Sequence, residues 1–370
     1  MKKLLALLLA LAMTLALAAC GAPAEESVDS GDTATEDTAT DAGTETDEGD
    51  AATEEEASPE ETEPEEADTS SAGTDEVTVR IGSLMGPTSI GLAKLRSDSE
   101  AGRSEGSYAF TLEADASALL TAVVNEELDI ALIPANAASI WYNRLEGGVT
   151  CLDVNTLGVL YVISADDSIA SIEDLAGKTI YLPGQGTSPD YVLQYLLSRH
   201  DMSLEDVTVE YQSEATEVIA ALTADPEGVG LLPQPSVTAA LGQLEGFSVV
   251  LDLTAEWGAV CDTDLLTGVT VVRTAFLEEH PEAVATFLAE HEASTSYVSE
   301  DVATVAQLVE DYGIMASAAV AEQAIPSCNV TYIDGEEMRA MVSAYLQVLY
   351  DLDPASVGGT LPGDDFYYLG

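Results

Sequence analysis

The sequence predicts an α/β protein with mostly parallel sheets, and two features of the chain carry this prediction. Short runs of β-branched and aliphatic residues alternate with helix-like segments from residue 77 to residue 273. Such alternation is typical of βαβ units, in which a helix joins two parallel strands. Beyond residue 280 helical patterns dominate to the end of the chain.

Each predicted strand is a short run rich in Val, Ile, Leu, Tyr or Phe, the residues that favour strands. The run at 129–133 stops at Pro134, because proline cannot donate a ladder hydrogen bond. Residues 157–163 form one long β-branched run and are predicted as a single strand. The predicted strands are 77–83, 108–112, 129–133, 157–163, 178–182, 207–211, 229–232, 247–253 and 268–273.

The predicted helices place Leu, Ala, Val or Ile at helical spacing behind most of these strands. They cover residues 90–95, 117–126, 135–145, 188–199, 215–223 and 236–244, followed by 281–297, 302–312, 316–323 and 336–352. A globular segment of this length, from residue 77 to residue 370, suggests about two domains.

The N-terminus carries the features of a secretory signal. Lys2 and Lys3 precede an apolar run, residues 4–19, which ends in Leu-Ala-Ala before Cys20. A cysteine at the first mature position is typical of bacterial lipoproteins, whose thiol receives a lipid. The alternative, a transmembrane anchor, needs about 20 apolar residues, which is more than this run offers. We therefore expect residues 1–19 to be a signal peptide and Cys20 to hold the protein at the outer face of the cytoplasmic membrane.

Residues 20–76 are predicted to be a disordered acidic tether. This segment contains no Lys, Arg or aromatic residue, and Val28 is its only large aliphatic side chain before residue 76. It cannot bury enough apolar surface to offset the entropy of ordering. The whole chain has a formal net charge of −56, and without a basic stripe it is not expected to bind nucleic acid.

The cysteines and histidines of the globular part do not suggest a metal site, a cofactor or a catalytic site. Cys151, Cys261 and Cys328 are an odd number, so at least one is unpaired within the chain. Cys261 and Cys328 could form a disulfide, but we expect three free thiols. The three histidines stand near no cysteine in sequence, so no zinc spacing is present.

Four loops are candidates for a ligand site, because ligands of parallel α/β sheets bind where the carboxyl ends of strands lead into helices. These loops are residues 85–89, 134–137, 183–189 and 233–235, and none contains Lys or Arg. The third loop lacks the Lys of a phosphate-binding loop, so we interpret it as a tight turn that offers helix N–H groups to a small ligand. The alternative is an ordinary strand-to-helix turn.

Trp257 is a further candidate, because it could stack on a flat solute, although it could equally be a core residue. The candidate ligand-binding residues are Gly86, Pro87, Thr88, Ser89, Pro134, Asn136, Gly184, Gln185, Gly186, Thr187, Ser188, Gln234 and Trp257.

Residues 77 to about 352 resemble the solute-binding proteins of ABC importers, in the branch that includes nitrate, taurine, alkanesulfonate and thiamine-precursor binders. The segments that carry the resemblance are 86–93 (GPTSIGLA), 129–136 (DIALIPAN), 155–161 (NTLGVLY), 182–189 (LPGQGTSP), 231–235 (LLPQP) and 278–283 (EEHPEA). Many relatives have an acidic residue where this chain has Gln234, which argues against a cationic ring ligand held by a carboxylate.

The resemblance implies a two-lobed type II periplasmic-binding fold with two crossing hinge strands, near 160–164 and 268–273. Lobe 1 would combine residues 77–161 with 267–370, and lobe 2 would be residues 162–266. It also implies a monomer without catalytic activity that passes a small organic solute to a membrane permease. The alternatives are an enzyme on the same fold, acting on a thiamine-pyrimidine or menaquinone precursor, and a solute sensor.

If the lobes close on a solute, Thr187 and Ser188 are expected to face Thr88 and Ser89, so that four hydroxyls converge on a polar group.

Overall fold

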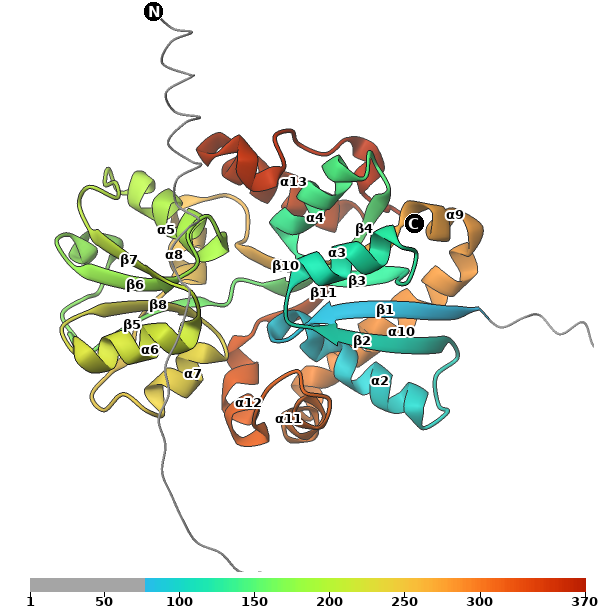
Figure 1. Cartoon of the computed structure of the whole chain (residues 1–370), viewed down its shortest axis with the longest axis horizontal. Helices are drawn as coiled ribbons and strands as arrows, with labels where there is room; N and C mark the ends of the chain where they lie inside the picture. Colours follow the sequence, from blue (N-terminus) through green and yellow to red (C-terminus); the bar gives the residue numbers. More distant parts are fainter. Residues whose placement is uncertain (1–76) are drawn as a thin grey trace, which may run out of the picture. The chain divides into compact units, whose positions relative to one another are not determined.

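The computed structural model describes residues 77–370, and these residues contain two β-sheets with helices on both faces of each (Figure 1). The predicted signal peptide, Cys20 and the whole of the predicted tether lie outside the described residues. No helix within residues 77–370 is long and apolar enough to cross a membrane.

The first sheet has six strands in the order β11-β4-β10-β3-β1-β2. β1 is parallel to β2 and β3, whereas β10 runs antiparallel to β3 and β4, and β11 antiparallel to β4. The strands are β1 (Thr78–Leu84), β2 (Ser107–Glu113), β3 (Ile130–Pro134), β4 (Val149–Leu157), β10 (Leu266–Arg273) and β11 (Val330–Asp334).

The second sheet has five strands in the order β7-β6-β8-β5-β9. β6 is parallel to β7 and β8, and β5 is antiparallel to β8 and β9. The strands are β5 (Leu160–Ser164), β6 (Thr179–Pro183), β7 (Thr208–Gln212), β8 (Val229–Pro233) and β9 (Ser248–Asp252). Most of the parallel pairs follow the predicted alternation of strand and helix.

Helices cover both faces of the first sheet. One face packs against α3 (Ala116–Val124), α4 (Ala135–Arg144) and α13 (Gly335–Leu352). The other packs against η1 (Pro87–Leu92), α2 (Ala93–Glu100), α9 (Thr274–Glu279) and α10 (Pro281–Glu300). The remaining C-terminal elements are α11 (Val302–Asp311), α12 (Ala318–Ala324), η3 (Ile325–Ser327), η4 (Pro354–Val357) and η5 (Asp364–Phe366).

The second sheet is also covered on both faces. α5 (Ser188–Arg199) and α8 (Leu253–Val260) pack on one face, and α6 (Ala215–Ala224) and α7 (Ser236–Leu241) on the other (Figure 1). A short turn, η2 (Ile172–Leu175), precedes β6. The apolar core on the α5 and α8 face is continuous with the core under α4 and α13 of the first sheet.

The chain passes between the sheets twice. It leaves the first sheet after β4, enters the second at β5, and returns from α8 into β10. The single strand predicted at 157–163 is therefore wrong, because Gly158 and Val159 separate β4 from β5. A side chain at position 158 would lie 2.3 Å from the Thr254 hydroxyl, so the crossing requires glycine. The boundary predicted at 161/162 falls inside β5.

Apart from short 3₁₀ helices, four elements were not predicted from the sequence: β4 before Leu157, β11, α8 and α9. β4 is buried along nearly its whole length, yet it contains Thr150, Asp153 and Asn155. These polar residues interrupt the apolar pattern by which a buried strand is recognised.

Cys151, Cys261 and Cys328 are free thiols. Cys151 and Cys328 are buried, and burial raises the pKa of both thiols, to about 12 for Cys328.

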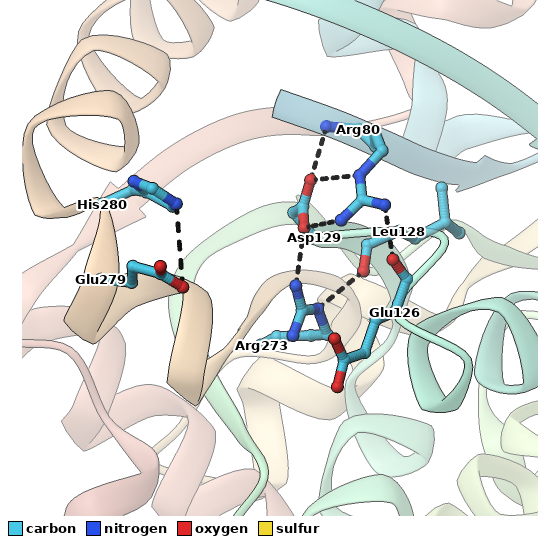
Figure 2. Close-up of polar contacts among 7 residues, drawn as sticks. All are labelled: Arg80, Glu126, Leu128, Asp129, Arg273, Glu279 and His280. Carbon is cyan, nitrogen blue, oxygen red and sulfur yellow. Dashed lines mark hydrogen bonds and ion pairs between the residues drawn. The ribbon is translucent and has the colours of Figure 1, made fainter. Parts of the chain in front are cut away.

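A buried carboxylate joins three strands of the first sheet. Asp129, immediately before β3, has a fully buried side chain that accepts hydrogen bonds from Arg80 of β1 and Arg273 of β10 (Figure 2). Arg80 Nε lies 2.8 Å from Asp129 Oδ2, and Arg273 Nη2 lies 2.9 Å from Oδ1. The backbone N–H of Arg80 also donates to Oδ2, at 3.0 Å. Asp129 thus fixes the positions of β1, β3 and β10 at the end of the sheet where β1 begins.

The pKa of the Asp129 carboxyl is lowered below its ordinary value. Burial raises this pKa, but the hydrogen bonds from Arg80 and Arg273 and the charge of Arg80 outweigh that effect. Because the folded-state pKa lies below the unfolded one, the carboxylate contributes stability above about pH 4. This contribution is lost as the pH falls through the folded-state pKa.

We predict that Asp129→Asn lowers the free energy of unfolding by about 3 kcal/mol at pH 7. This is the low end of the range for breaking a buried ion pair, since the Arg80 side chain is 38% exposed. Urea denaturation at several pH values measures the difference, which should shrink below about pH 4. The control is Asp166→Asn, which removes a more exposed ion pair with Lys178 and should have a much smaller effect. Equal losses in the two variants would contradict the role given to Asp129.

Candidate functional site

The carboxyl ends of parallel strands from both sheets lie beside the two crossings. In the first sheet, Pro134 at the end of β3 pairs with Gly268 of β10, and Leu157 at the end of β4 pairs with Leu266. In the second sheet, Pro233 at the end of β8 pairs with Leu160, two residues after Gly158. Two of the four predicted loops, 134–137 and 233–235, therefore start at strands that adjoin the crossing strands. The other two, 85–89 and 183–189, start one strand further away, at β1 and β6.

The loop at 85–89 joins β1 to η1 in a tightly bonded conformation. Gly86 has a φ of 107°, which a residue with a side chain rarely adopts, and its N–H donates to Ile314 O at 3.1 Å. Pro87 occupies the first position of η1. The Ser89 side chain is completely buried, and its hydroxyl donates to Leu84 O. Ser89 therefore holds the turn together rather than presenting a free hydroxyl.

Thr88 and Asn155 meet at Gly268. A Cβ atom placed on Gly268 would lie 2.4 Å from Asn155 Oδ1 and 2.5 Å from Thr88 Cγ2. Thr88 is 7% exposed and Asn155 2% exposed, so both side chains lie just beneath the surface at the ends of β4 and β10. The absence of a side chain at position 268 lets the carboxamide oxygen of Asn155 and the methyl group of Thr88 pack closely against this glycine.

Asn136 lies further from this point. It is the second residue of α4, and its Nδ2 makes a long contact of 3.4 Å with Ser356 O in η4. The carboxamide of Asn136 thus faces the C-terminal segment, as do Ser139 and Asn143 on the same helix, which bond to Val357 O.

The glycine-containing loop of the second sheet is organised by a carboxylate of its own. Gly184 and Gly186 have φ values of 73° and 71°. Asp190, which is 3% exposed, accepts from the Gly186 N–H at 2.8 Å and from the Tyr211 hydroxyl at 2.9 Å. Burial and this bond to Asp190 raise the pKa of Tyr211 to about 12. The N–H of Gly186 that we expected to be offered to a ligand is therefore taken by Asp190.

The other polar residues of this loop also bond locally. The Thr187 hydroxyl donates to Gly184 O at 2.7 Å, while the Gln185 side chain is exposed. Ser188 lies near the buried Tyr345 of α13; burial raises the pKa of Tyr345, and the neighbouring Ser188 partly offsets the increase. Within residues 77–370, no hydrogen bond joins Thr187 or Ser188 to Thr88 or Ser89, and the convergence of the four hydroxyls on a solute stays a prediction.

Gln234 is 5% exposed and lies at the first crossing. Its N–H donates to Val159 O at 2.9 Å. Its Oε1 accepts from the Thr238 hydroxyl at 2.8 Å, so the carboxamide also caps the start of α7. The neutral amide thus performs a capping role that a carboxylate at this position could also perform.

Trp257 is a core residue, and its expected role in stacking on a solute is not supported by its position. The side chain is fully buried, and the indole N–H donates to Thr263 O at 2.8 Å. Its ring lies 4.4 Å from Tyr195 and 5.8 Å from Tyr345, measured between centroids. A solute could reach this ring only if α5, α8 and α13 separated.

The site has no local positive charge. Of the 11 Lys and Arg residues, Lys2 and Lys3 precede the described residues, and the remaining nine lie outside the four loops. Arg80 and Arg273 are bound to Asp129, and Lys178 to Asp166. No group of three or more His, Cys, Asp or Glu side chains suited to a metal ion occurs within residues 77–370.

Comparison with known proteins identifies the class of protein from this arrangement. The chain has the periplasmic binding protein fold, which confirms the predicted two-lobed α/β architecture. Residues 149–303, less than half of the chain, match the family model described as NMT1/THI5 like, in agreement with the resemblance seen in the sequence. No curated protein matches the chain.

Solved structures of similar fold include several components of ABC transporters. An ABC transporter protein from Parabacteroides distasonis is 21% identical, with a TM-score of 0.67 over 79% of this chain and 98% of that chain. The periplasmic aliphatic sulphonate binding protein SsuA from Escherichia coli is 17% identical, with a TM-score of 0.64 over 79% and 92%. The alkanesulfonate-binding protein SsuA from Xanthomonas axonopodis pv. citri, bound to MOPS, is 17% identical, with a TM-score of 0.56 over 77% and 94%.

Sequence reasoning missed Asn155, Gly268 and Asp190 as parts of the candidate site. Asn155 begins one of the segments that carry the family resemblance, and Asp190 lies one residue beyond another, so proximity to these segments was the available signal. Gly268 could not be found in this way, because its importance depends on side chains from β4 and η1 that only the fold brings together.

We predict that Gly268→Ala lowers the free energy of unfolding by about 1–3 kcal/mol, because the added methyl overlaps Asn155 and Thr88. Thermal and urea denaturation measure the change. Gly258→Ala is the matched control: this glycine lies inside α8 with no atom within 4 Å of the added methyl, so the substitution should be neutral or stabilising. A neutral Gly268→Ala would show that the contact between Asn155 and Thr88 at this point is loose.

Proposed function

We propose that this chain is an extracytoplasmic solute-binding protein that captures a small organic solute and delivers it to the permease of an ABC importer. The fold and the NMT1/THI5-like segment support this proposal. The predicted signal peptide and Cys20 support attachment to the outer face of the cytoplasmic membrane through a lipid. A tethered receptor would remain close to the permease that it serves.

The observation that carries the proposal is that polar loops of both sheets lie beside the two chain crossings. Neutral hydrogen-bonding residues lie there: Thr88 and Asn155 at Gly268 of β10, and Gln234 at Val159. Short loops at the carboxyl ends of strands are the usual location of ligands in α/β sheets. Hydroxyl and amide groups suit reversible binding, and the site offers no nucleophile with a neighbouring base, so no observation favours the enzyme alternative.

The first crossing is held from one side in a way that suits a hinge. Asn329, just after η3, makes two hydrogen bonds to the crossing. Its Nδ2 donates to Gly158 O at 2.6 Å, and its backbone oxygen accepts from the Leu157 N–H at 3.0 Å. The Tyr161 hydroxyl donates to Ser327 O at 3.0 Å. These bonds fix both ends of a crossing only two residues long, so a change in angle between the sheets would be concentrated at Gly158 and Val159.

The proposal predicts that a solute of this protein stabilises it against heat. At a hundred times its dissociation constant, a ligand should add about 2.7 kcal/mol to the free energy of unfolding. A thermal-shift screen of the full mature chain against sulfonates, pyrimidines, nitrate and amino-acid-like compounds tests this, followed by calorimetric titration of each hit. Failure of every compound class, and of small molecules extracted from cells, would contradict a solute-binding role.

The lipid anchor gives a separate prediction. Cys20→Ser removes the thiol that would carry the lipid, so the protein should leave the membrane fraction when cells are fractionated. Cys261→Ser, which changes a half-buried thiol in the globular part, is the control and should stay with the membrane. Retention of the Cys20→Ser protein in the membrane fraction would indicate another mode of attachment.

A further inference from the structure

A chain of buried hydrogen bonds runs from the core of the first sheet to the candidate site. The Thr270 hydroxyl donates to Asp153 Oδ1 at 2.9 Å, and Asn155 Nδ2 donates to Thr270 Oγ1 at 3.2 Å. The Thr156 hydroxyl donates to Asn155 Oδ1 at 2.9 Å. Asp153, Thr270 and Thr156 have no exposed surface, and Asn155 is 2% exposed. This series of hydrogen bonds ends beside Gly268, where Asn155 and Thr88 both lie.

The carboxylate fixes the direction of every bond in this chain. The Thr270 hydroxyl has a single proton and donates it to Asp153 Oδ1. The oxygen of Thr270 is then left as an acceptor, and it receives a proton from the amide nitrogen of Asn155. The amide group of Asn155 is thereby oriented with its nitrogen toward Thr270 and its oxygen toward Thr156 and Gly268.

The bonding of Asp153 is poor for a buried acid, which argues against a purely structural role. Its Oδ2 has no hydrogen-bond partner, and its Oδ1 lies 3.7 Å from Nε2 of the equally buried His291. Neither ring nitrogen of His291 has a hydrogen-bond partner. Buried polar groups without partners lower stability, so the placement of Asp153 is costly and is not explained by stability alone.

We propose that Asp153 is a positioning residue that determines solute specificity by turning the Asn155 oxygen toward the site. The floor of the site is then a hydrogen-bond acceptor, and the solute presents an N–H or O–H donor to Asn155 Oδ1. Such a solute is neutral or positively charged, and an anion such as a sulfonate is disfavoured. This inference rests on the proposed function, because it concerns the solute of that same site.

Two other features of the site agree with a donor-bearing solute. The four loops contain no Lys or Arg to neutralise an anion. The N–H of Gly186 near the start of α5, a natural position for an anionic group, is occupied by the Asp190 carboxylate. The inference separates this chain from the two SsuA proteins of similar fold, which are described as sulfonate-binding.

The test uses pairs of compounds that share a carbon skeleton and differ only in the head group. Benzenesulfonamide is compared with benzenesulfonate, and butylamine with butanesulfonate, by calorimetric titration of the full mature chain. We expect the donor-bearing member of each pair to bind at least about tenfold more tightly, the change expected when a buried acceptor gains or loses its donor. Equal or tighter binding of the sulfonates would overturn the inference and leave the proposed function intact. Binding of neither series would also overturn the inference, whereas the proposed function would fall only if every compound class of the thermal-shift screen failed as well.

Two variants test the role of Asp153 itself. In Asp153→Asn the side chain can donate to Thr270, which frees the Thr270 proton and allows the Asn155 amide to reverse. The preference for donor-bearing compounds should then fall by about tenfold. The orientation of the Asn155 amide can be followed directly by nuclear Overhauser effects from its NH₂ protons to the methyl groups of Thr270 and Thr156. An unchanged preference with an unchanged orientation would overturn the positioning role.

A second pair of variants covers the case in which Asp153→Asn fails to fold. Thr270→Ser keeps the hydroxyl and should keep the preference for donor-bearing compounds. Thr270→Val removes the hydroxyl and should reduce this preference. The measured quantity is the ratio of two affinities in the same protein, so a general loss of stability does not imitate the effect. Equal ratios in Thr270→Ser and Thr270→Val would refute the proposed chain of hydrogen bonds.

Discussion

The buried Asp129 carboxylate is the interaction on which the geometry of the candidate site depends. It is bound by arginines of β1 and β10 and lies at the start of β3, so it fixes the relative positions of three adjacent strands. β10 is the strand on which the chain returns from the second sheet. From Arg273 to Gly268 it spans five residues, about 17 Å at the rise of an extended strand. An ion pair at one end of β10 thus sets where Gly268 lies at the other.

The same register aligns the buried polar residues of β4 and β10. Thr270 is paired with Asp153, although irregularities interrupt the pairing on both sides of this position. A slip of one residue would turn the side chains of β10 to the opposite face of the sheet. Asp153 would then lose its only close hydrogen-bond donor, and Asn155 its acceptor at Thr270. The ion pair and the polar chain therefore support each other through one strand.

The sequence predicted the fold more completely than the site. Alternating strands and helices gave the α/β class and the four loops, because these depend on local periodicity and on turn residues. β4 was missed because Asp153 and Asn155 resemble loop residues until their partners on β10 are known. The loop at 183–189 was predicted. The hydrogen bond between its Gly186 N–H and Asp190 was not, since the position of Asp190 also depends on Tyr211 of a different strand. Partners distant in sequence leave no periodic signal.

The distribution of charge bears on the kind of solute that this fold can hold. With a formal net charge of −56, the chain repels anions at long range, although salt screens the exposed charges beyond about 8 Å. A site for an anion would therefore need a basic side chain nearby. Two of the nine basic residues beyond position 76 are used to hold Asp129, and none lies in the four loops. The site is left with amides and hydroxyls whose directions are set by buried carboxylates, Asp153 on one sheet and Asp190 on the other. A site of this composition discriminates between solutes by the direction of hydrogen bonds rather than by charge neutralisation.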